Sequence, residues 1–175
     1  VQDLMPHNLH FVHGPGCPVC VLPVGRIDNA IELVEKQDVI LCTYGDMLRV
    51  PASGRNSLLK VKASGGDVRM VYSTQDVLKI ARDNPGREVV FFAIGFETTT
   101  PPTAVALLQA RAEGLKNFTV FCNHVLTPAA VRAILESREP VRIDGFLGPS
   151  HVSTVIGSQP YEVFARQYQK PIVIA

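Results

Sequence analysis

The chain has no tryptophan, only four cysteines, and a net charge of +1 over 175 residues. Four cysteines are too few for a disulfide framework, so we expect a reducing compartment and a cytoplasmic protein. The near-neutral charge gives no electrostatic reason to expect nucleic acid or an anionic membrane as a partner. No apolar run approaches the roughly 18 residues of a membrane span, and no signal peptide pattern is present. With 46% apolar residues, a folded soluble protein is the remaining class.

Three signatures of common enzyme classes are also missing from the sequence. There is no Gly-x-x-x-x-Gly-Lys-Ser/Thr loop and no Gly-x-Gly-x-x-Gly, so nothing predicts nucleotide binding. The absence of a Gly-x-Ser-x-Gly elbow weakens a hydrolase interpretation.

The most informative stretch is residues 14–23, Gly-Pro-Gly-Cys-Pro-Val-Cys-Val-Leu-Pro. Prolines and glycines fix a turn that carries Cys17 and Cys20, and such a turn can hold two sulfurs together as a disulfide or on a soft metal. One Cys-x-x-Cys cannot complete a tetrahedral metal site. The pair is therefore a redox dithiol, or part of a metal site that another chain or segment completes. Cys42 and Cys122 lie in apolar runs and are predicted to be core residues.

Short β-branched runs alternate with amphipathic helical patterns along the chain, which predicts βαβ units and a doubly wound parallel sheet. Thr100 and Thr127 each precede a proline and are interpreted as helix N-caps. One helical stripe follows the i, i+3, i+4, i+7 spacing from Ile27 to Val34. The predicted strands are 9–13, 39–43, 68–72, 89–95, 118–122, 143–147 and 171–175.

A loop-rich stretch at residues 52–66 interrupts this alternation. We therefore expect an α/β protein of two Rossmann-like lobes, each a parallel sheet flanked by helices. The first lobe would be residues 1–73 with the Cys-x-x-Cys loop, and the second residues 74–175. The chain begins with Val1 and stops directly after a predicted strand, so we expect an excised piece of a larger protein.

The turns that follow the predicted strands carry the remaining reactive side chains. Chemistry in such sheets gathers at the carboxyl ends of strands, so we expect these turns to line one cleft. Asp46 and Arg49 either form an ion pair with each other or have a functional role in this cleft. Glu97 follows its strand at a position where a buried carboxylate could act as acid, base or ligand. His151 follows a Gly-Pro turn and could carry protons or bind metal, as could His124.

Four stretches together resemble the HypD family of hydrogenase maturation proteins: GPGCPVCVLP, TYGDMLRVP, GFETTTP and GPSHVSTVIG. They occur in the family's order across nearly the whole chain. Two positions depart from the family pattern, Ala52 and Ser150, where glycine is usual. The family's Cys-Gly-Gly-His motif and the cysteines for its [4Fe–4S] cluster are absent from this chain.

The resemblance implies a scaffold for assembling the Fe(CN)2CO centre of [NiFe]-hydrogenases. It implies a HypC-type chaperone and the HypE–HypF cyanide donor as partners, and a metallocofactor-assembly scaffold rather than a conventional turnover enzyme. Cys17 and Cys20 match the redox-active dithiol and would also be the metal ligands. The other matched residues line the cleft between the lobes: Asp46, Glu97 and His151 with chemical roles, and Arg49, Thr98 and Thr99 as cofactor-binding groups.

Two alternatives remain open on the residues alone. The first is a cytosolic thiol–disulfide oxidoreductase that acts through Cys17 and Cys20 without iron. The second is a protein-binding module whose cleft motifs only recognise a partner, for which Cys17 would be dispensable.

Overall fold

The structure is a computed structural model that describes residues 4–14, 16–139 and 141–174. Its main unit is a four-stranded sheet of order β2-β1-β3-β4, in which every neighbouring pair is parallel. All seven residues of β3 are buried. This agrees with its nearly continuous apolar run, which predicted a strand covered on both faces. The strands are β1 (Ile40–Thr43), β2 (Val68–Met70), β3 (Val89–Gly95) and β4 (Phe118–His124).

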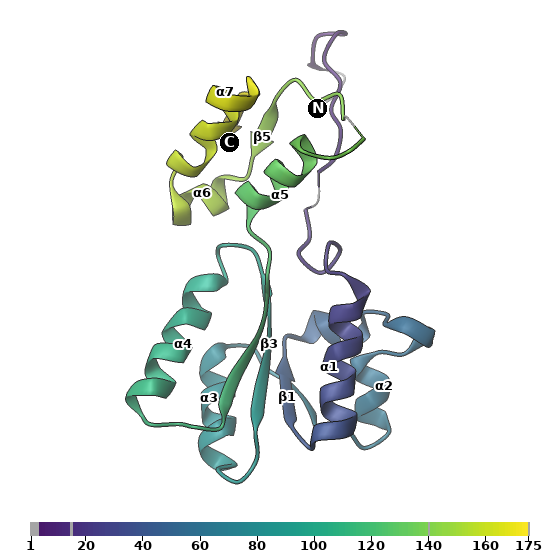
Figure 1. Cartoon of the computed structure of the whole chain (residues 1–175), viewed down its shortest axis with the longest axis vertical. Coiled ribbons are helices and arrows are strands. Elements are labelled where there is room, and N and C mark those ends of the chain that lie inside the picture. Colours follow the sequence, from purple (N-terminus) through teal and green to yellow (C-terminus); the bar gives the residue numbers. More distant parts are fainter. Residues whose placement is uncertain (1–3, 15, 140, 175) are drawn as a thin grey trace.

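Helices cover both faces of this sheet (Figure 1). One face carries α1 (Val24–Gln37) and α2 (Leu58–Ala63), and the other carries α3 (Thr74–Asp83) and α4 (Thr100–Ala112). None of the helices within the described residues is both long and apolar enough to cross a membrane. The predicted stripe of α1 is the face that it buries, namely Ile27, Ala30, Ile31 and Val34.

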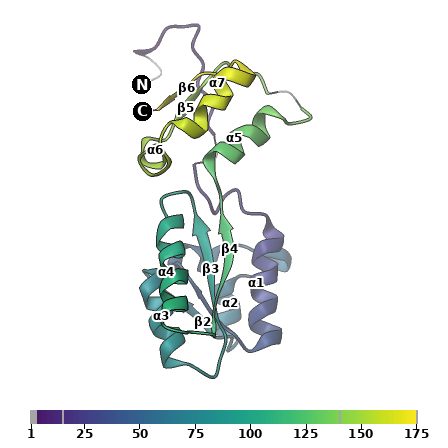
Figure 2. The same cartoon turned by 60° about the vertical axis from the view of Figure 1, so that its left-hand side comes forward.

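A smaller unit follows β4, and its two strands, β5 and β6, pair in parallel. Its core is built on Val131, Tyr161 and Phe164. Figure 2 shows this unit beyond the ends toward which the arrows of β3 and β4 point. Its elements are α5 (Thr127–Leu135), β5 (Phe146–Gly148), α6 (Ser150–Ile156), the 3-10 helix η4 (Gln159–Tyr161), α7 (Glu162–Tyr168) and β6 (Ile172–Ile174).

Six of the seven predicted strands are present, and the predicted α/β class is confirmed for one lobe with a four-stranded parallel sheet. The strand predicted at 9–13 is wrong: this segment pairs with no strand, and Val12 is 72% exposed, so its apolar pattern has no sheet to join. Residue 175 of the last predicted strand lies outside the described residues. The boundary predicted after residue 73 falls between β2 and α3, which belong to the same layered unit, and the division into two lobes stays a prediction.

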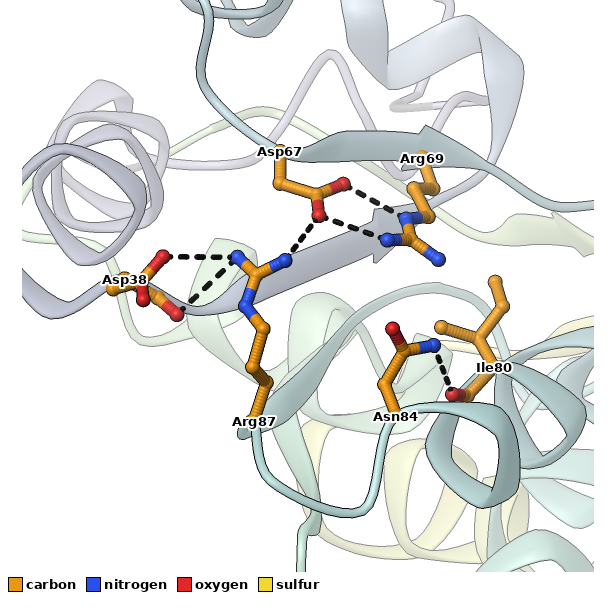
Figure 3. A network of polar contacts seen from close by, with 6 residues as sticks. All are labelled: Asp38, Asp67, Arg69, Ile80, Asn84 and Arg87. Atoms are coloured by element: carbon orange, nitrogen blue, oxygen red, sulfur yellow. Dashed lines mark hydrogen bonds and ion pairs between the residues drawn. The ribbon is translucent and has the colours of Figure 1, made fainter.

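The amino ends of three strands are joined by a network of ion pairs (Figure 3). Arg87, just before β3, donates from Nη1 to Oδ2 of Asp67 at 2.6 Å and from Nη2 to Oδ1 of Asp38 at 3.0 Å. Arg69 donates to both oxygens of Asp67, at 2.8 and 2.9 Å. The hydrogen bond from Arg69 contributes most, and together with that from Arg87 it holds the pKa of the Asp67 carboxyl below its usual range. The loops that enter β1, β2 and β3 are thereby fixed to one another.

Candidate functional site

The carboxyl edge of the four-stranded sheet contains a point where the winding reverses. The chain leaves β1 for β2 on one side, and later returns past β1 to form β3 on the other. In open parallel sheets, loops leave two neighbouring strands in opposite directions at such a point, and ligands generally bind outside the strand ends there. We call this place the crevice. The 3-10 helix η2 (Gly45–Arg49) follows β1, and the turn at 96–99 follows β3. Because α1 runs back toward the start of β1, its first turn and the preceding cysteine turn lie at this same edge (Figure 1).

The two cysteines of that turn are free thiols with unequal acidity. Cys17 is partly exposed and Cys20 is exposed. The Cys20 amide donates to the Cys17 carbonyl at 3.1 Å and to the Cys17 Sγ at 3.3 Å. The hydrogen bond from the Cys20 thiol, followed by that from its amide, lowers the pKa of Cys17, and the same thiol contact raises the pKa of Cys20. Cys17 is therefore the sulfur of the pair that ionises first.

Asp46 and Arg49 lie on η2, directly after β1, and both side chains are exposed. Met47 between them is fully buried and anchors η2 to the core. The pKa of Cys17 is lowered chiefly by Cys20, and the Asp46 carboxylate opposes this with a small influence that raises it. The pairing of Asp46 with Arg49 considered from the sequence is not among the ion pairs of the described residues. Both charges are thus available to other groups.

Glu97 is buried, with 3% of its surface exposed. Its Oε1 accepts the backbone N–H of Thr127 at 2.5 Å, and its Oε2 accepts the Thr127 hydroxyl at 3.0 Å. The Glu97 carboxylate thus accepts from one of the N–H groups that α5 leaves unpaired at its amino end, and its negative charge lies at the positive end of the helix dipole. The N-cap predicted at Thr127 is wrong by one residue, because Leu126 holds that position and Glu97 supplies the capping oxygen instead. Glu97 therefore fixes the smaller unit to the turn after β3.

Thr99 holds the N-cap position of α4, one residue before the predicted Thr100. Thr99 and Thr100 donate their hydroxyl protons to the Phe96 carbonyl, at 2.9 and 3.3 Å. No side-chain capping bond forms at this helix end, because both hydroxyl protons stabilise the preceding turn. Thr98 alone is exposed toward solvent.

Gly95 allows this turn to form. Its φ is +153°, and a Cβ built there would lie 1.7 Å from the Thr99 Oγ1. A side chain cannot share that space, so only glycine lets β3 end directly against the threonine turn.

His124 ends β4 beside this turn and is half-buried. Its Nδ1 lies 3.4 Å from the Thr99 Oγ1 and its Nε2 lies 3.1 Å from the Thr103 Oγ1. Burial lowers the pKa of His124, so the ring is neutral at neutral pH. The sequence indicated His124 only by its place at a strand end. In the structure its ring packs against Thr99 and Thr103, on the inner side of the turn after β3.

His151 lies in the first turn of α6 and is exposed. Within the described part of the chain, no hydrogen bond or ion pair joins it to another of the predicted site residues. The structure therefore brings Cys17 and Cys20 together in one turn, and it places Asp46 on η2 after β1 and Glu97 and Thr98 on the turn after β3. It leaves His151 in the smaller unit.

Sequence reasoning missed three residues at this edge. Arg26 in α1 and the buried Asn123 in β4 join their side chains at 2.6 Å. Tyr161 is 4% exposed, and its hydroxyl has no hydrogen-bond partner among the described residues. Burial raises the pKa of Tyr161, against an opposing influence of the neighbouring Ser153 side chain and with a smaller contribution from the Glu97 charge. A polar asparagine within an apolar strand run was the one available signal for this set.

The residues present were tested as a metal site. Within the described ranges, no group of three or more His, Cys, Asp or Glu side chains could hold a metal ion. The thiols of Cys17 and Cys20 suit iron chemically but supply two ligands only. Cys42 is fully buried as predicted, and burial raises the pKa of its thiol to about 12. The core position predicted for Cys122 is wrong, because β4 is an edge strand and this thiol is exposed.

Comparisons with known proteins give a consistent result. The model of the HypD family, described as the hydrogenase formation hypA family, matches residues 1–175. The chain is similar to the hydrogenase maturation factor HypD of Azotobacter vinelandii, with 65% identity over 100% of this chain and 47% of the relative. It is similar to that of Escherichia coli, with 50% identity over 100% of this chain and 46% of the relative. The chain thus spans about half the length of the curated relatives that it matches.

Proposed function

The chain belongs to the HypD family, and from this premise we propose that it acts in hydrogenase maturation, as part of a scaffold on which the Fe(CN)2CO centre is assembled. Iron is the cargo of this process. A HypC-type chaperone shares the cargo, and a HypE–HypF pair delivers cyanide. The named function of its relatives supports this proposal at the level of the pathway.

The observation that carries the proposal is the unequal thiol pair at the carboxyl edge of the sheet. Cys17 has a lowered pKa and is partly exposed beside the crevice. A thiolate is the form that binds iron, and soft sulfur ligands suit iron in a low oxidation state. Two thiolates leave coordination positions open for cyanide, carbon monoxide and ligands from the partner. A site with two protein ligands therefore fits a cargo that must be handed on.

The pair would also store electrons. When Cys17 and Cys20 form one S–S bond, two thiol protons and two electrons leave the pair. The electrons would go to the chemistry that attaches ligands to the iron cargo, and the [4Fe–4S] cluster of the longer family members would return them. This chain contains no set of four cysteines for that cluster, since its two other cysteines are Cys42, which is buried, and Cys122, which is exposed on β4.

The surrounding residues take supporting roles in the proposal. Asp46 opposes ionisation of Cys17 and would favour release of the cargo once the thiols are protonated again. Arg49 and Thr98 are exposed at the crevice and would contact the ligand donor, with Thr99 holding their turn. Glu97 would act by positioning the smaller unit through Thr127, while the exposed His151 would exchange protons with the solvent.

The experiment is anaerobic thiol mapping. The chain is incubated with ferrous iron and a purified HypC-type partner, alkylated, and its modified cysteines are identified by mass spectrometry. The proposal predicts that Cys17 and Cys20 are protected only when iron and partner are both present, while Cys122 is modified throughout. A disulfide between Cys17 and Cys20 that forms regardless of iron would favour the thiol–disulfide oxidoreductase. A Cys17→Ser variant that still supports full hydrogenase activity in cells would favour the binding module.

A further inference from the structure

The cysteine turn itself has few polar ties to the rest of the molecule. Among the described residues, the hydrogen bonds of residues 16–22 stay within the turn, as in the bond from the Leu22 amide to the Val19 carbonyl. Val19 and Leu22 pack against the core beside α1. Apolar contact is non-directional, so this packing alone does not fix where the thiols lie along the sheet edge. The position of the turn depends on the start of α1.

Arg26, in the first turn of α1, is joined to the carboxyl end of β4 by three contacts. Its Nε donates to the Asn123 Oδ1 at 2.6 Å, and its Nη2 donates to the Cys122 carbonyl at 3.2 Å. Its guanidinium carbon lies 4.2 Å from the centre of the Phe121 ring. A planar guanidinium can bond in its plane and stack on an aromatic face at once, which an ammonium cannot do. The three contacts together fix both the place and the orientation of the helix start.

The Asn123 side chain is oriented for this contact by a hydrogen bond of its own. It is 7% exposed, and its Nδ2 donates to the Phe121 carbonyl at 2.9 Å. This bond turns the Oδ1 toward Arg26. The acceptor is therefore held in place by the strand. The other ties of this part of α1 are the apolar contacts from Ile27 onward and the Asp28 carboxylate, which accepts the Ser53 N–H at 2.9 Å and the Ser53 hydroxyl at 2.7 Å. The Asp28 bonds join α1 to the loop after β1, whereas, among the described residues, only Arg26 joins it to β4 by hydrogen bonds.

We propose that Arg26 is the positioning residue of the thiol pair: through Asn123, Phe121 and Cys122 it fixes the start of α1, and with it Cys17 and Cys20, at the crevice where iron is assembled. The expected effect on hydrogenase maturation rests on the proposed function. The positioning of Cys17 and Cys20 by Arg26 does not depend on iron. Arg26 does not touch the thiols and acts through the backbone of residues 20–26.

The test measures position directly. A nitroxide is placed on Cys17 and another at Lys116→Cys, in a Cys20→Ser, Cys122→Ser background, since the buried Cys42 does not react. Pulsed electron paramagnetic resonance gives the distance distribution between the labels. We expect one narrow distribution in this parent, and one that is about twofold wider after Arg26→Lys. Asn123→Ser, which removes the acceptor and leaves the arginine, should widen it in the same way.

The matched control is Arg82→Lys, which breaks the two bonds of Arg82 to Glu113, at 2.7 and 2.8 Å, on the opposite face of the sheet. It should leave the distribution narrow. A distribution that stays narrow after both Arg26→Lys and Asn123→Ser would overturn the proposal, as would an equal widening after Arg82→Lys.

The functional consequence is measured in cells whose gene for this protein carries the single substitution with all cysteines present. At unchanged protein abundance, Arg26→Lys should lower hydrogenase activity about tenfold, and Arg82→Lys should not. Unchanged activity after Arg26→Lys, together with loss of activity after Cys17→Ser, would contradict the positioning role and leave the proposed function standing. Full activity after Cys17→Ser would contradict the proposed function itself, while the distance measurement would still decide the structural part.

Discussion

The two edges of the four-stranded sheet use polar side chains in opposite ways. At the amino edge, Asp38, Asp67, Arg69 and Arg87 neutralise one another in a connected network (Figure 3). At the carboxyl edge, Cys17, Asp46 and Arg49 are at least partly exposed and share no ion pair among the described residues. Charges that satisfy each other stabilise a fold, whereas groups left unsatisfied on rigid turns are available to a ligand. The amino edge of the sheet thus serves stability, and the proposed function places the chemistry at the carboxyl edge.

The carboxyl edge itself has an inner and an outer layer. The inner layer, Glu97 and His124, is wholly or half buried and bonded to threonines. The outer layer is Cys17, Cys20 and Asp46. In the proposed function, the inner layer shapes the crevice and the outer layer meets the cargo.

The largest effect is expected from Cys17→Ser, which should lower hydrogenase maturation by about 100-fold or more, because it removes the thiolate and both proposed roles of the pair. The stability of the chain should not change, since Cys17 is not part of the core. Hydrogenase activity in cells and chemical denaturation give the two readouts. Cys122→Ser, which removes another exposed thiol, is the control and should match the parent in both.

Gly95→Ala should cost roughly 2–4 kcal/mol of unfolding free energy, because the new Cβ meets the Thr99 hydroxyl at a positive φ. Urea denaturation measures this loss. Gly86→Ala is the control, since a Cβ there meets nothing within 4 Å. Equal stability of the two variants would show that the turn after β3 is not rigid.

Asp67→Asn should cost about 1–2 kcal/mol at neutral pH, because it weakens the bonds to Arg69 and Arg87. The pKa of Asp67 is lowered in the folded state, so its contribution is present above the unfolded value near 4 and is lost as the pH falls through the folded value. The variant should therefore show a weaker loss of stability below about pH 4. Asp144→Asn, at an exposed position, is the control. Lowered hydrogenase maturation at unchanged abundance in Asp67→Asn would contradict the separation of the two edges.

The smallest effect is expected from His124→Gln. Burial lowers the pKa of His124 in the folded state, so the unfolded chain binds the proton more readily and stability falls as the pH drops below about 6.5. The variant should lose this part of the pH dependence between pH 7 and pH 5, a change smaller than that expected for Asp67→Asn. Thermal unfolding at several pH values measures it, with the exposed His10→Gln as control. An unchanged slope would contradict the burial of a neutral ring.

Much of the sheet and the location of the thiol pair could be predicted from the sequence. Periodicity identified β3 and the buried stripe of α1, because a buried strand and an amphipathic helix impose their spacing on the residues. It failed at residues 9–13, where an apolar pattern exists without a partner strand, and at Cys122, where an edge strand looks like a central one. Strand order cannot be seen in such patterns.

Only those parts of the candidate site that are formed by residues close together in the sequence could be predicted. Cys17 and Cys20 share one turn, so their spacing was sufficient. The contact of Glu97 with Thr127 spans 30 residues and that of Arg26 with Asn123 spans 97. Such pairs depend on the order of the strands, and the sequence gives no local sign of them.

The most direct measurement is iron K-edge X-ray absorption on the chain loaded anaerobically with ferrous iron together with a HypC-type partner. The account predicts sulfur ligands in the first shell of the iron, and their number should fall in Cys17→Ser and fall further when Cys20→Ser is added. A sulfur shell that is the same in the parent and in the double variant would contradict the claim that this pair holds the cargo.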